Sequence, residues 1–528
     1  MPRTMELSYP MLGVGRRATL RSTPDARGPW PSPWSVNCRV YDNIDRRLRG
    51  GSRPGLTKYV STDFGTTIAD IASVNTSSAS GGASTTLVVL SDSTLSTVEG
   101  GTAATPVAYL TDESGNIITD ESDNRIYVGT GTPPASGFLV VGGQYAYSVT
   151  TSGITRMDPK TGETNTVVAS AGTIPTDCTF GAVYRDRFCL SGEDNAIYMS
   201  RRGDYTDWDY GVHVDDSDGP LVFQLAHAAH VGARPTAIID HKDTAMLVGT
   251  QRTLWHVAGD PGGDGTLRRV SENVGIISSR AWCKIEDSIC FLSTDGIYRV
   301  QADGSGITPL SENTIPDELR DIDTATTTVS MGYEHDRMAV HIFLRTSGGS
   351  DNHWLYELQT ESWWSLRFQN NHTPLACCQH DGELLLAGGD GHIRKIGGDN
   401  DDGTDIQSHV SIGPVRLGSS GHFGRMLNMH ASLAAGGGTV NWRLVTGDTA
   451  EEATDNVKLA IEAFQSGGSY ASYVKASGAW TSGRAVMAYP RIRAVWCCLW
   501  LQSTAKWAYE GVTIESEASG KWRGSTSA

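Results

Sequence analysis

The chain has 528 residues, of which 39% are hydrophobic and 8% aromatic, so it is long enough for a large core and more than one domain. Its formal net charge of −16 argues against a protein that grips nucleic acid through phosphate contacts, because such binding needs clustered Lys and Arg. The 60 glycines, with Thr, Ser and Asp clusters between short apolar runs, are typical of an all-β protein with tight turns.

The first 60 residues differ in charge from the rest of the chain. They contain eleven Lys or Arg and four Asp or Glu, so they carry roughly +7 and the remainder roughly −23. We predict an extended basic N-terminal arm over 1–60, which is either a solvated terminus or a segment that docks on an acidic neighbour such as another copy of the chain. The candidates for this subunit interface are Arg16, Arg17, Arg39, Arg46, Arg47, Arg49 and Arg53.

One short phrase recurs six times between residues 153 and 396. Each copy places an apolar anchor after a polar turn, and a second apolar strand precedes that turn, as in "DSICFLSTDGIYRV" at 287–300. Successive anchors are 43, 57, 43, 58 and 38 residues apart, a range that brackets the roughly 40–50 expected of propeller blades. In chain order the anchors are Ile154, Ile197, Leu254, Ile297, Leu355 and Ile393.

This repeat predicts a β-propeller over 61–400. A meandering sheet of three or four strands cannot bury both faces alone, but copies stacked around an axis bury them and leave only short edges. We expect about seven blades, uncertain by one, including a degenerate blade at 84–130. The six anchors, together with Trp255 and Tyr298, are the candidates for the propeller core. An array of β-sandwiches is the alternative, since it would show similar alternation with a less regular period.

The composition and the repeat pattern of the sequence change near residue 400. "GGDNDDGTD" (397–405) has the composition of a linker, and the segments after it lack the repeated phrase. A helix is predicted over 449–464, with Thr449 as its N-cap and Glu451 and Glu452 in its first turn. We predict a C-terminal β-rich, sandwich-like domain over 401–528.

The nine cysteines include two adjacent pairs and no CxxC motif. Neighbours on a strand point to opposite faces and cannot easily bridge, so reduced thiols are expected, as in a protein made in a cytosol. The start "MPRTMELSYPMLGVG" lacks an apolar signal core, and no stretch reaches membrane-spanning length. We therefore expect neither export by the usual signal nor a membrane span.

No catalytic motif stands out. The sequence has no GxSxG, HExxH or Walker motif. His227 and His230 have a spacing that suits a helix face, but no third zinc ligand lies near them. Asp399, Asp401 and Asp405 faintly resemble a calcium loop without its closing glutamate, and an acidic turn is the simpler interpretation. We predict no enzyme activity, no cofactor and no metal site.

Several segments, in the same order, resemble those of one family. These are "RGGSRPGLTKY" (49–59), "YMSRRGDYTDWDYG" (198–211), "LWHVAGDPGGDGTLRRVSENVGIISSRAW" (254–282), "FLSTDGIYRV" (291–300) and "LSENTIPDEL" (310–319). They are similar to the propeller-bearing tail proteins of short-tailed bacteriophages, called nozzle, tail tubular or packaged-DNA-stabilisation proteins. The likeness covers roughly residues 35–400 and is strongest over 180–320.

The resemblance implies a structural virion protein, made in the cytoplasm of a bacterial host and built into the tail or neck. It implies a ring of six copies below the portal and head-to-tail adaptor. This ring would continue and close the DNA exit channel, retain packaged DNA and hold fibres or spikes. Genomic DNA would pass through without sequence-specific binding, and acidic walls would let it slide.

Two other functions stay open at this point. One is a receptor- or carbohydrate-binding propeller of the virion surface, whose best aromatic platforms would be "TESWWSL" (360–366) and "DYTDWDY" (204–210), although core packing explains these residues as well. The other is a propeller glycosidase or lyase, which needs paired carboxylates at the propeller mouth.

Overall fold

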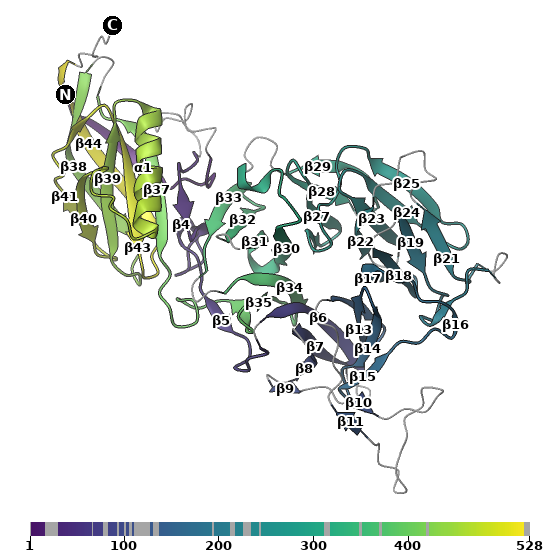
Figure 1. The fold of residues 1–528 in the computed structure, drawn as a ribbon. Helices are drawn as coiled ribbons and strands as arrows, with labels where there is room; N and C mark the ends of the chain where they lie inside the picture. The colour runs from purple at the N-terminus through teal and green to yellow at the C-terminus, as the bar shows by residue number, and fades with distance from the viewer. Residues whose placement is uncertain are drawn as a thin grey trace.

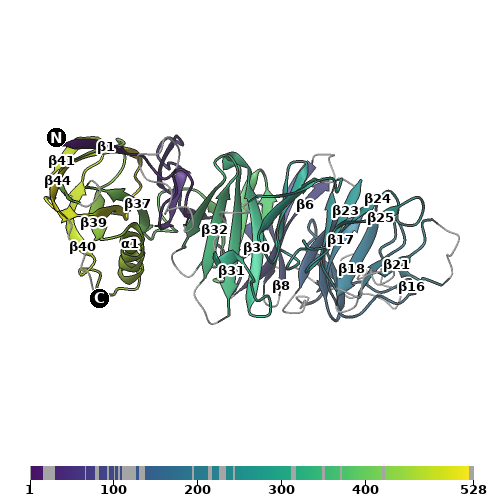
Figure 2. The same cartoon turned by 90° about the horizontal axis from the view of Figure 1, so that it is seen from above.

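The protein consists of a disc of radially arranged sheets and a β-sandwich at the rim of that disc (Figure 1). Figure 2 shows the disc edge-on, with the sandwich and its helix at one end. This computed structural model describes residues 2–15, 30–65, 67–77, 83–91, 94–99, 102–104, 108–109, 127–129, 137–192, 195–211, 217–224, 234–241, 244–301, 303–310, 317–347, 351–368, 372–418 and 422–521.

Seven groups of four antiparallel strands form the disc, which confirms the predicted all-β propeller. We number them blades 1 to 7 in chain order. Blade 1 is β6 (Ile68–Ser77), β7 (Ala83–Ser91), β8 (Thr94–Glu99) and β9 (Thr102–Ala104); blade 2 is β12 (Phe138–Gly142), β13 (Tyr145–Thr150), β14 (Gly153–Asp158) and β15 (Glu163–Thr166). Blade 3 is β17 (Cys178–Tyr184), β18 (Arg187–Gly192), β19 (Ala196–Met199) and β21 (Leu221–Gln224); blade 4 is β22 (Pro235–His241), β23 (Ala245–Thr250), β24 (Leu254–Ala258) and β25 (Thr266–Ser271).

The last three blades continue the ring, and the final one takes its fourth strand from the N-terminal segment. Blade 5 is β26 (Trp282–Ile285), β27 (Ser288–Leu292), β28 (Ile297–Gln301) and β29 (Ile307–Pro309); blade 6 is β30 (Thr327–Glu334), β31 (Ala339–Thr346), β32 (Asn352–Glu357) and β33 (Ser362–Leu366). Blade 7 is β34 (Pro374–His380), β35 (Glu383–Gly388), β36 (Ile393–Ile396) and β5 (Leu56–Lys58). The pairs β10 (Ala108–Tyr109) with β11 (Tyr127–Gly129) and β16 (Ala171–Gly172) with β20 (Asp207–Trp208) lie outside the blades.

The repeated phrase forms the third strand of blades 2 to 7, and its apolar anchor is buried in every copy. This position is apolar because the middle of a blade packs against neighbouring blades on both faces. Trp255 is buried too. Tyr298 is half-buried: its ring stacks on that of Phe291 with centroids 6.0 Å apart, and its hydroxyl donates to Asp295 (2.8 Å).

The predicted degenerate blade had the wrong boundaries. Blade 1 begins at residue 68 rather than 84, and within the described residues β11 pairs with β10 and with no strand of blade 1. Residues 124–126, the first part of "NRIYVGT", lie outside the described residues. The missed strand, β6, reads "IADIASVNTS", in which buried apolar positions alternate irregularly with polar ones across a register shift near Asp70.

The described part of residues 1–60 is not an extended free arm. β1 (Arg3–Leu7) pairs with β44 (Tyr509–Lys521) at the edge of the sandwich, and β2 (Ser35–Val36) lies between blade 6 and the sandwich. Between β2 and β5, β3 (Cys38–Tyr41) and β4 (Leu48–Ser52) form a hairpin. The segment is held because its apolar side chains, among them Trp30, Trp34 and Val40, are buried.

The sandwich packs two sheets face to face over one apolar core. One sheet contains β1, β44, β38 (His422–Leu433), β41 (Ala485–Ala488) and β42 (Arg493–Ala494). The other contains β37 (Ser408–Arg416), β43 (Trp496–Ser503), β39 (Val440–Gly447) and β40 (Val474–Trp480), and it continues through β2 into blade 6 as one nine-stranded sheet. Propeller and sandwich therefore share backbone hydrogen bonds rather than a flexible linker.

Helix α1 (Ala450–Gln465) covers the outer face of the second sheet, close to the predicted range. The Glu452 backbone N–H donates to the Thr449 hydroxyl (3.0 Å), which confirms the predicted N-cap. Cys497 faces the core between the two sheets and Cys498 faces the helix side, as expected of neighbours on a strand. All nine cysteines are free thiols.

Two histidines are buried among aromatic rings. His353 on β32 lies beside Phe368 and Phe343, with ring centroids 5.2 and 5.7 Å away. His409 on β37 lies beside Phe464 and Trp500. Burial lowers the pKa of each imidazole to about 3, helped by neighbouring positive charge, so both are neutral at pH 7.

We predict that the protein loses stability on mild acidification. Below pH 6.5 the unfolded chain protonates both histidines, whereas the folded chain does so only near pH 3. The unfolded state therefore binds more protons, and each histidine lowers the free energy of unfolding by about 1.4 kcal/mol per pH unit between these values. Urea denaturation of wild type and His353→Phe at pH 6.5, 5.5 and 4.5 measures this. A variant with the wild-type pH slope contradicts the assignment for His353.

Candidate functional site

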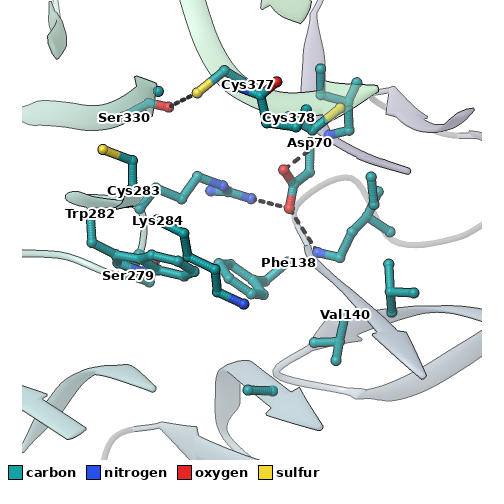
Figure 3. A pocket seen from close by; sticks show the side chains of 18 of the residues that line it. Asp70, Phe138, Val140, Ser279, Trp282, Cys283, Lys284, Ser330, Cys377 and Cys378 are labelled. Carbon is teal, nitrogen blue, oxygen red and sulfur yellow. Dashed lines mark hydrogen bonds and ion pairs between the residues drawn. The ribbon is translucent and has the colours of Figure 1, made fainter. Parts of the chain in front are cut away.

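A cavity of about 440 Å³ lies on the axis of the disc. It is lined by the first strands of all seven blades, which makes these strands the innermost ones. Figure 3 shows Asp70, Phe138, Trp282, Cys283 and Cys377 around it. An apolar cavity with a few polar groups is the default candidate for a binding site, so its charged groups decide what it can do.

An ion pair crosses the axis inside this cavity. The Arg280 guanidinium, just before blade 5, lies 2.8 Å from Asp70 on blade 1, and Arg280 also donates to the Gly137 carbonyl beside blade 2 (3.2 Å). The carboxylate of Asp70 accepts the backbone N–H groups of Ile71 (2.9 Å) and Leu139 (2.7 Å). With side-chain exposures of 23% and 9%, Arg280 and Asp70 neutralise each other in a mostly buried position.

A second pair lies closer to solvent. Lys284 on blade 5 contacts Asp240 on blade 4 at 3.1 Å, with side-chain exposures of 43% and 41%. The thiols of the cavity are not activated, because burial raises the pKa of Cys377 to about 11 and that of Cys378 well above its usual value. The cavity thus holds balanced charges and neutral thiols.

The axial cavity is too small to be a conduit for nucleic acid. The Arg280–Asp70 pair spans it, and its volume of about 440 Å³ cannot hold a DNA duplex. The arrangement instead links blades 1, 2 and 5 through the middle of the ring. Arg280 lies in "LWHVAGDPGGDGTLRRVSENVGIISSRAW", but nothing in the sequence connects it with Asp70, about 200 residues earlier.

Two of the predicted interface arginines are buried within the chain, so their prediction is wrong. Arg39 is 1% exposed and contacts Glu334 (2.8 Å) and Glu357 (2.7 Å) of blade 6. Arg53 is 3% exposed and pairs with Asp401 (2.6 Å), which is 2% exposed. A buried arginine needs its partner inside the same fold, and a second subunit cannot reach either side chain.

Arg53 lies at the junction of propeller and sandwich. Besides Asp401, it donates to the side-chain oxygen of Asn37 (2.9 Å) and to the carbonyl of Arg367 (2.8 Å), and it lies over the ring of Phe368 at 5.0 Å. Its contacts therefore join the N-terminal segment, blade 6 and the connection to the sandwich.

The other five arginines differ in availability. Arg49 is largely buried and binds Asp42 (2.9 Å), Asp45 (2.9 Å) and Glu510 (3.4 Å). Arg46 and Arg47 are 67% and 68% exposed at their side chains, so their role at an interface stays a prediction. Arg16 and Arg17 lie outside the described residues.

The aromatic platforms considered for carbohydrate binding are core residues. Trp363 and Trp364 are fully buried, and Trp208 is 1% exposed. Stacking on a sugar needs an exposed ring face, so these tryptophans cannot supply it.

The acidic turn near residue 400 is occupied by cations of the chain. Asp401 binds Arg53, and Asp399 contacts Lys506 at 2.9 Å. His227 and His230 lie outside the described residues. Among residues that are described, no group of three His, Cys, Asp or Glu side chains is placed to hold a metal ion.

No protein-family model and no curated protein matches this sequence. The solved structures similar to it include the extracellular domain of a one-component system protein from B. thetaiotaomicron, with 12% identity and a TM-score of 0.42 over 72% of this chain. The match spans 43% of that domain's length. Others are a virginiamycin B lyase from Staphylococcus aureus (11% identity, TM-score 0.37, 65% of this chain and 98% of that one) and the WD40 propeller domain of Doa1 (10%, 0.35, 65% and 95%).

These neighbours bear on the fold alone, and one of them is an enzyme. The propeller assignment rests on the sheet order described above. No helix in the described part of the chain is long and apolar enough to cross a membrane.

We predict that Arg53→Ala strongly destabilises the protein. It leaves the Asp401 carboxylate buried without its guanidinium, which costs about 3–5 kcal/mol of unfolding free energy. Chemical denaturation measures the loss. Arg47→Ala is the matched control, because its side chain is 68% exposed and a surface pair contributes at most about 1 kcal/mol. Equal effects of the two substitutions would contradict the assigned role of Arg53.

We also predict that the axial pair stabilises the ring more than the pair near solvent does. Arg280→Ala leaves Asp70 with only backbone donors and lowers the free energy of unfolding by about 2 kcal/mol. Lys284→Ala, which breaks a half-exposed pair, changes it by less than about 1 kcal/mol. Chemical denaturation of the two variants measures both losses in the free energy of unfolding. A larger loss for Lys284→Ala than for Arg280→Ala would contradict the prediction.

Proposed function

We propose that this chain is a structural protein of the bacteriophage virion, located in the tail or neck and without a catalytic role. In this proposal six copies form a ring below the portal and adaptor. The ring continues and closes the DNA exit channel, retains the packaged DNA and anchors fibres or spikes. The basis is the resemblance of residues 35–400 to nozzle and packaged-DNA-stabilisation proteins, together with the construction of the fold.

One observation carries the proposal: propeller and sandwich are fused into one rigid block. A nine-stranded sheet runs from blade 6 through β2 into the sandwich, and the axis of the disc is blocked by Arg280 and Asp70. A rigid block of this kind suits a ring that must hold its shape against packed DNA. An open cleft with activated groups would have favoured an enzyme instead.

The segments that resemble the phage proteins contain residues that connect parts of the fold or pack in its core. "RGGSRPGLTKY" contains Arg53, which binds Asp401, and β5, which closes blade 7. "YMSRRGDYTDWDYG" contains the end of β19 and the buried Trp208. Residues used in this way favour a structural protein, because their chemistry serves packing.

The blocked axis also locates the passage in this proposal. Since DNA cannot run through a single propeller, the channel lies between copies, around the symmetry axis of the ring. A cyclic ring needs two different complementary patches on each copy. The net charge of −16 supports acidic walls, along which phosphates are repelled and the duplex slides.

We predict that the purified full-length chain forms a ring with a central passage. Light scattering of the chain alone and with its head-to-tail adaptor is expected to give a mass of six chains, and negative-stain electron micrographs a hollow particle. A compact monomer in both samples would falsify the proposal. A reconstruction in which mainly Lys and Arg line the lumen would contradict the proposal that DNA slides along acidic walls.

A further inference from the structure

Two cysteines lie opposite each other on the first two strands of blade 5. Cys283 on β26 pairs with Cys290 on β27 in the antiparallel register, so both side chains lie on the same face of the sheet. Directly opposite residues have Cα atoms about 4.5–5.5 Å apart, and a disulfide spans roughly 4.4–6.8 Å between Cα atoms. The hairpin therefore holds the two residues at a separation that a disulfide can bridge.

This pairing distinguishes Cys283 and Cys290 from the other cysteines. All nine cysteines belong to the described part of the chain, and in its sheet registers the other seven lie opposite residues that have no thiol. Cys189 on the second strand of blade 3, for example, lies opposite Ala182 on the first strand. The sheet geometry thus selects Cys283 and Cys290 as the pair that can be bridged.

The two thiols are in contact and buried. A hydrogen bond joins the Cys283 and Cys290 thiols, and this bond, together with burial, holds the pKa of Cys283 well above its usual value. The two residues are 6% and 0% exposed and belong to one apolar cluster. Because the thiolate rather than the thiol is the nucleophile, we expect the pair to react slowly near neutral pH.

Cys283 is reached from the axial cavity. It lines this cavity of about 440 Å³ beside Trp282 and Lys284 (Figure 3), whereas Cys290 lies on the next strand outward from the axis. Hydrogen peroxide is small enough for a cavity of this size and meets Cys283 first. Cys283 is therefore the attacking thiol, and Cys290 is the resolving one.

We propose that Cys283 and Cys290 form a disulfide when the protein meets hydrogen peroxide. The deprotonated sulfur of Cys283 attacks one peroxide oxygen, the O–O bond breaks, and the leaving hydroxide takes up the thiol proton, which gives a sulfenic acid and water. The Cys290 sulfur then attacks the sulfenic sulfur: the S–S bond forms, the S–O bond breaks, and the hydroxyl leaves as water with the Cys290 proton. Two electrons pass from the sulfurs to the peroxide.

The disulfide would fix the wall of the axial cavity. It joins β26 to β27 three residues after Arg280, whose guanidinium forms the axial pair with Asp70. A bond between residues 283 and 290 also restricts the unfolded chain, and so it stabilises the hairpin once oxidised. This site is independent of the proposed ring, because it needs no second copy of the chain.

The test treats the folded full-length protein with hydrogen peroxide and maps its peptides by mass spectrometry. We expect a linkage between Cys283 and Cys290 that a reductant reverses, and a loss of two of the nine free thiols. The rate of linkage is expected to rise about tenfold from pH 7 to pH 8, because the thiolate fraction rises tenfold per pH unit below the pKa. The thermal unfolding midpoint should rise on oxidation.

Three variants separate the pair from the other thiols. Cys290→Ser removes the resolving thiol, so Cys283 should stop at a sulfenic acid that dimedone traps, and the linkage should disappear. Cys189→Ser is the matched control, because Cys189 lies in the third residue pair from the hairpin turn of blade 3, as Cys290 does in blade 5. This control should keep the linkage. Ala182→Cys places a thiol opposite Cys189 and should give a second disulfide, which tests the same geometry even if Cys290→Ser does not fold.

Two results overturn the inference. One is that peroxide leaves the thiols of the folded wild type unlinked at both pH values. The other is a bond from Cys283 to Cys377, which also lines the cavity, in place of the bond to Cys290. Either result leaves the proposed function standing, and a chain that fails to form the ring leaves the disulfide standing.

Discussion

The buried ion pair between Arg53 and Asp401 fixes the junction of propeller and sandwich, and the rest of the structure depends on this junction. Both side chains are almost completely buried, so each charge would be severely destabilised without the other. Arg53 belongs to the N-terminal segment, and Asp401 to the connection that leaves blade 7 for the sandwich. Three residues after Arg53 begins β5, the strand that completes blade 7. Ring closure and the placement of the sandwich are thus fixed by one contact region.

This construction couples distant parts of the chain. β5 pairs with β36 more than 330 residues later, β1 pairs with β44 about 500 residues later, and Arg39 binds two glutamates of blade 6. Bringing such separated segments together has a substantial loop-closure entropy cost, which buried ion pairs and sheet hydrogen bonds must offset. In return, the N-terminal segment ties propeller and sandwich together on several sides, and the two bodies cannot rotate freely.

The blade pattern could be predicted from the sequence because a blade buries both faces. An apolar anchor such as Ile297 therefore recurs in blades 2 to 7, at separations of 38 to 58 residues. The first blade was misplaced because β6 mixes polar residues into its buried face. The N-terminal arm was misjudged for a different reason: Arg39 and Arg53 look like solvated charges beside Pro and Gly. Their partners Glu334, Glu357 and Asp401 lie about 300 residues or more away in the sequence. No local sequence pattern predicts an ion pair between residues so far apart. The axial pair of Asp70 and Arg280 escaped prediction for the same reason.

The internal arginines also shape the surface on which any assembly must be built. Arg39 takes two carboxylates inward with it, those of Glu334 and Glu357, whereas the buried Arg187 donates to the backbone carbonyls of Ser200 and Gly219. An acidic block repels its own copies unless some basic feature is exposed at the contact. In the proposed ring, such a negative surface would repel the phosphates of DNA and favour sliding of the duplex between copies.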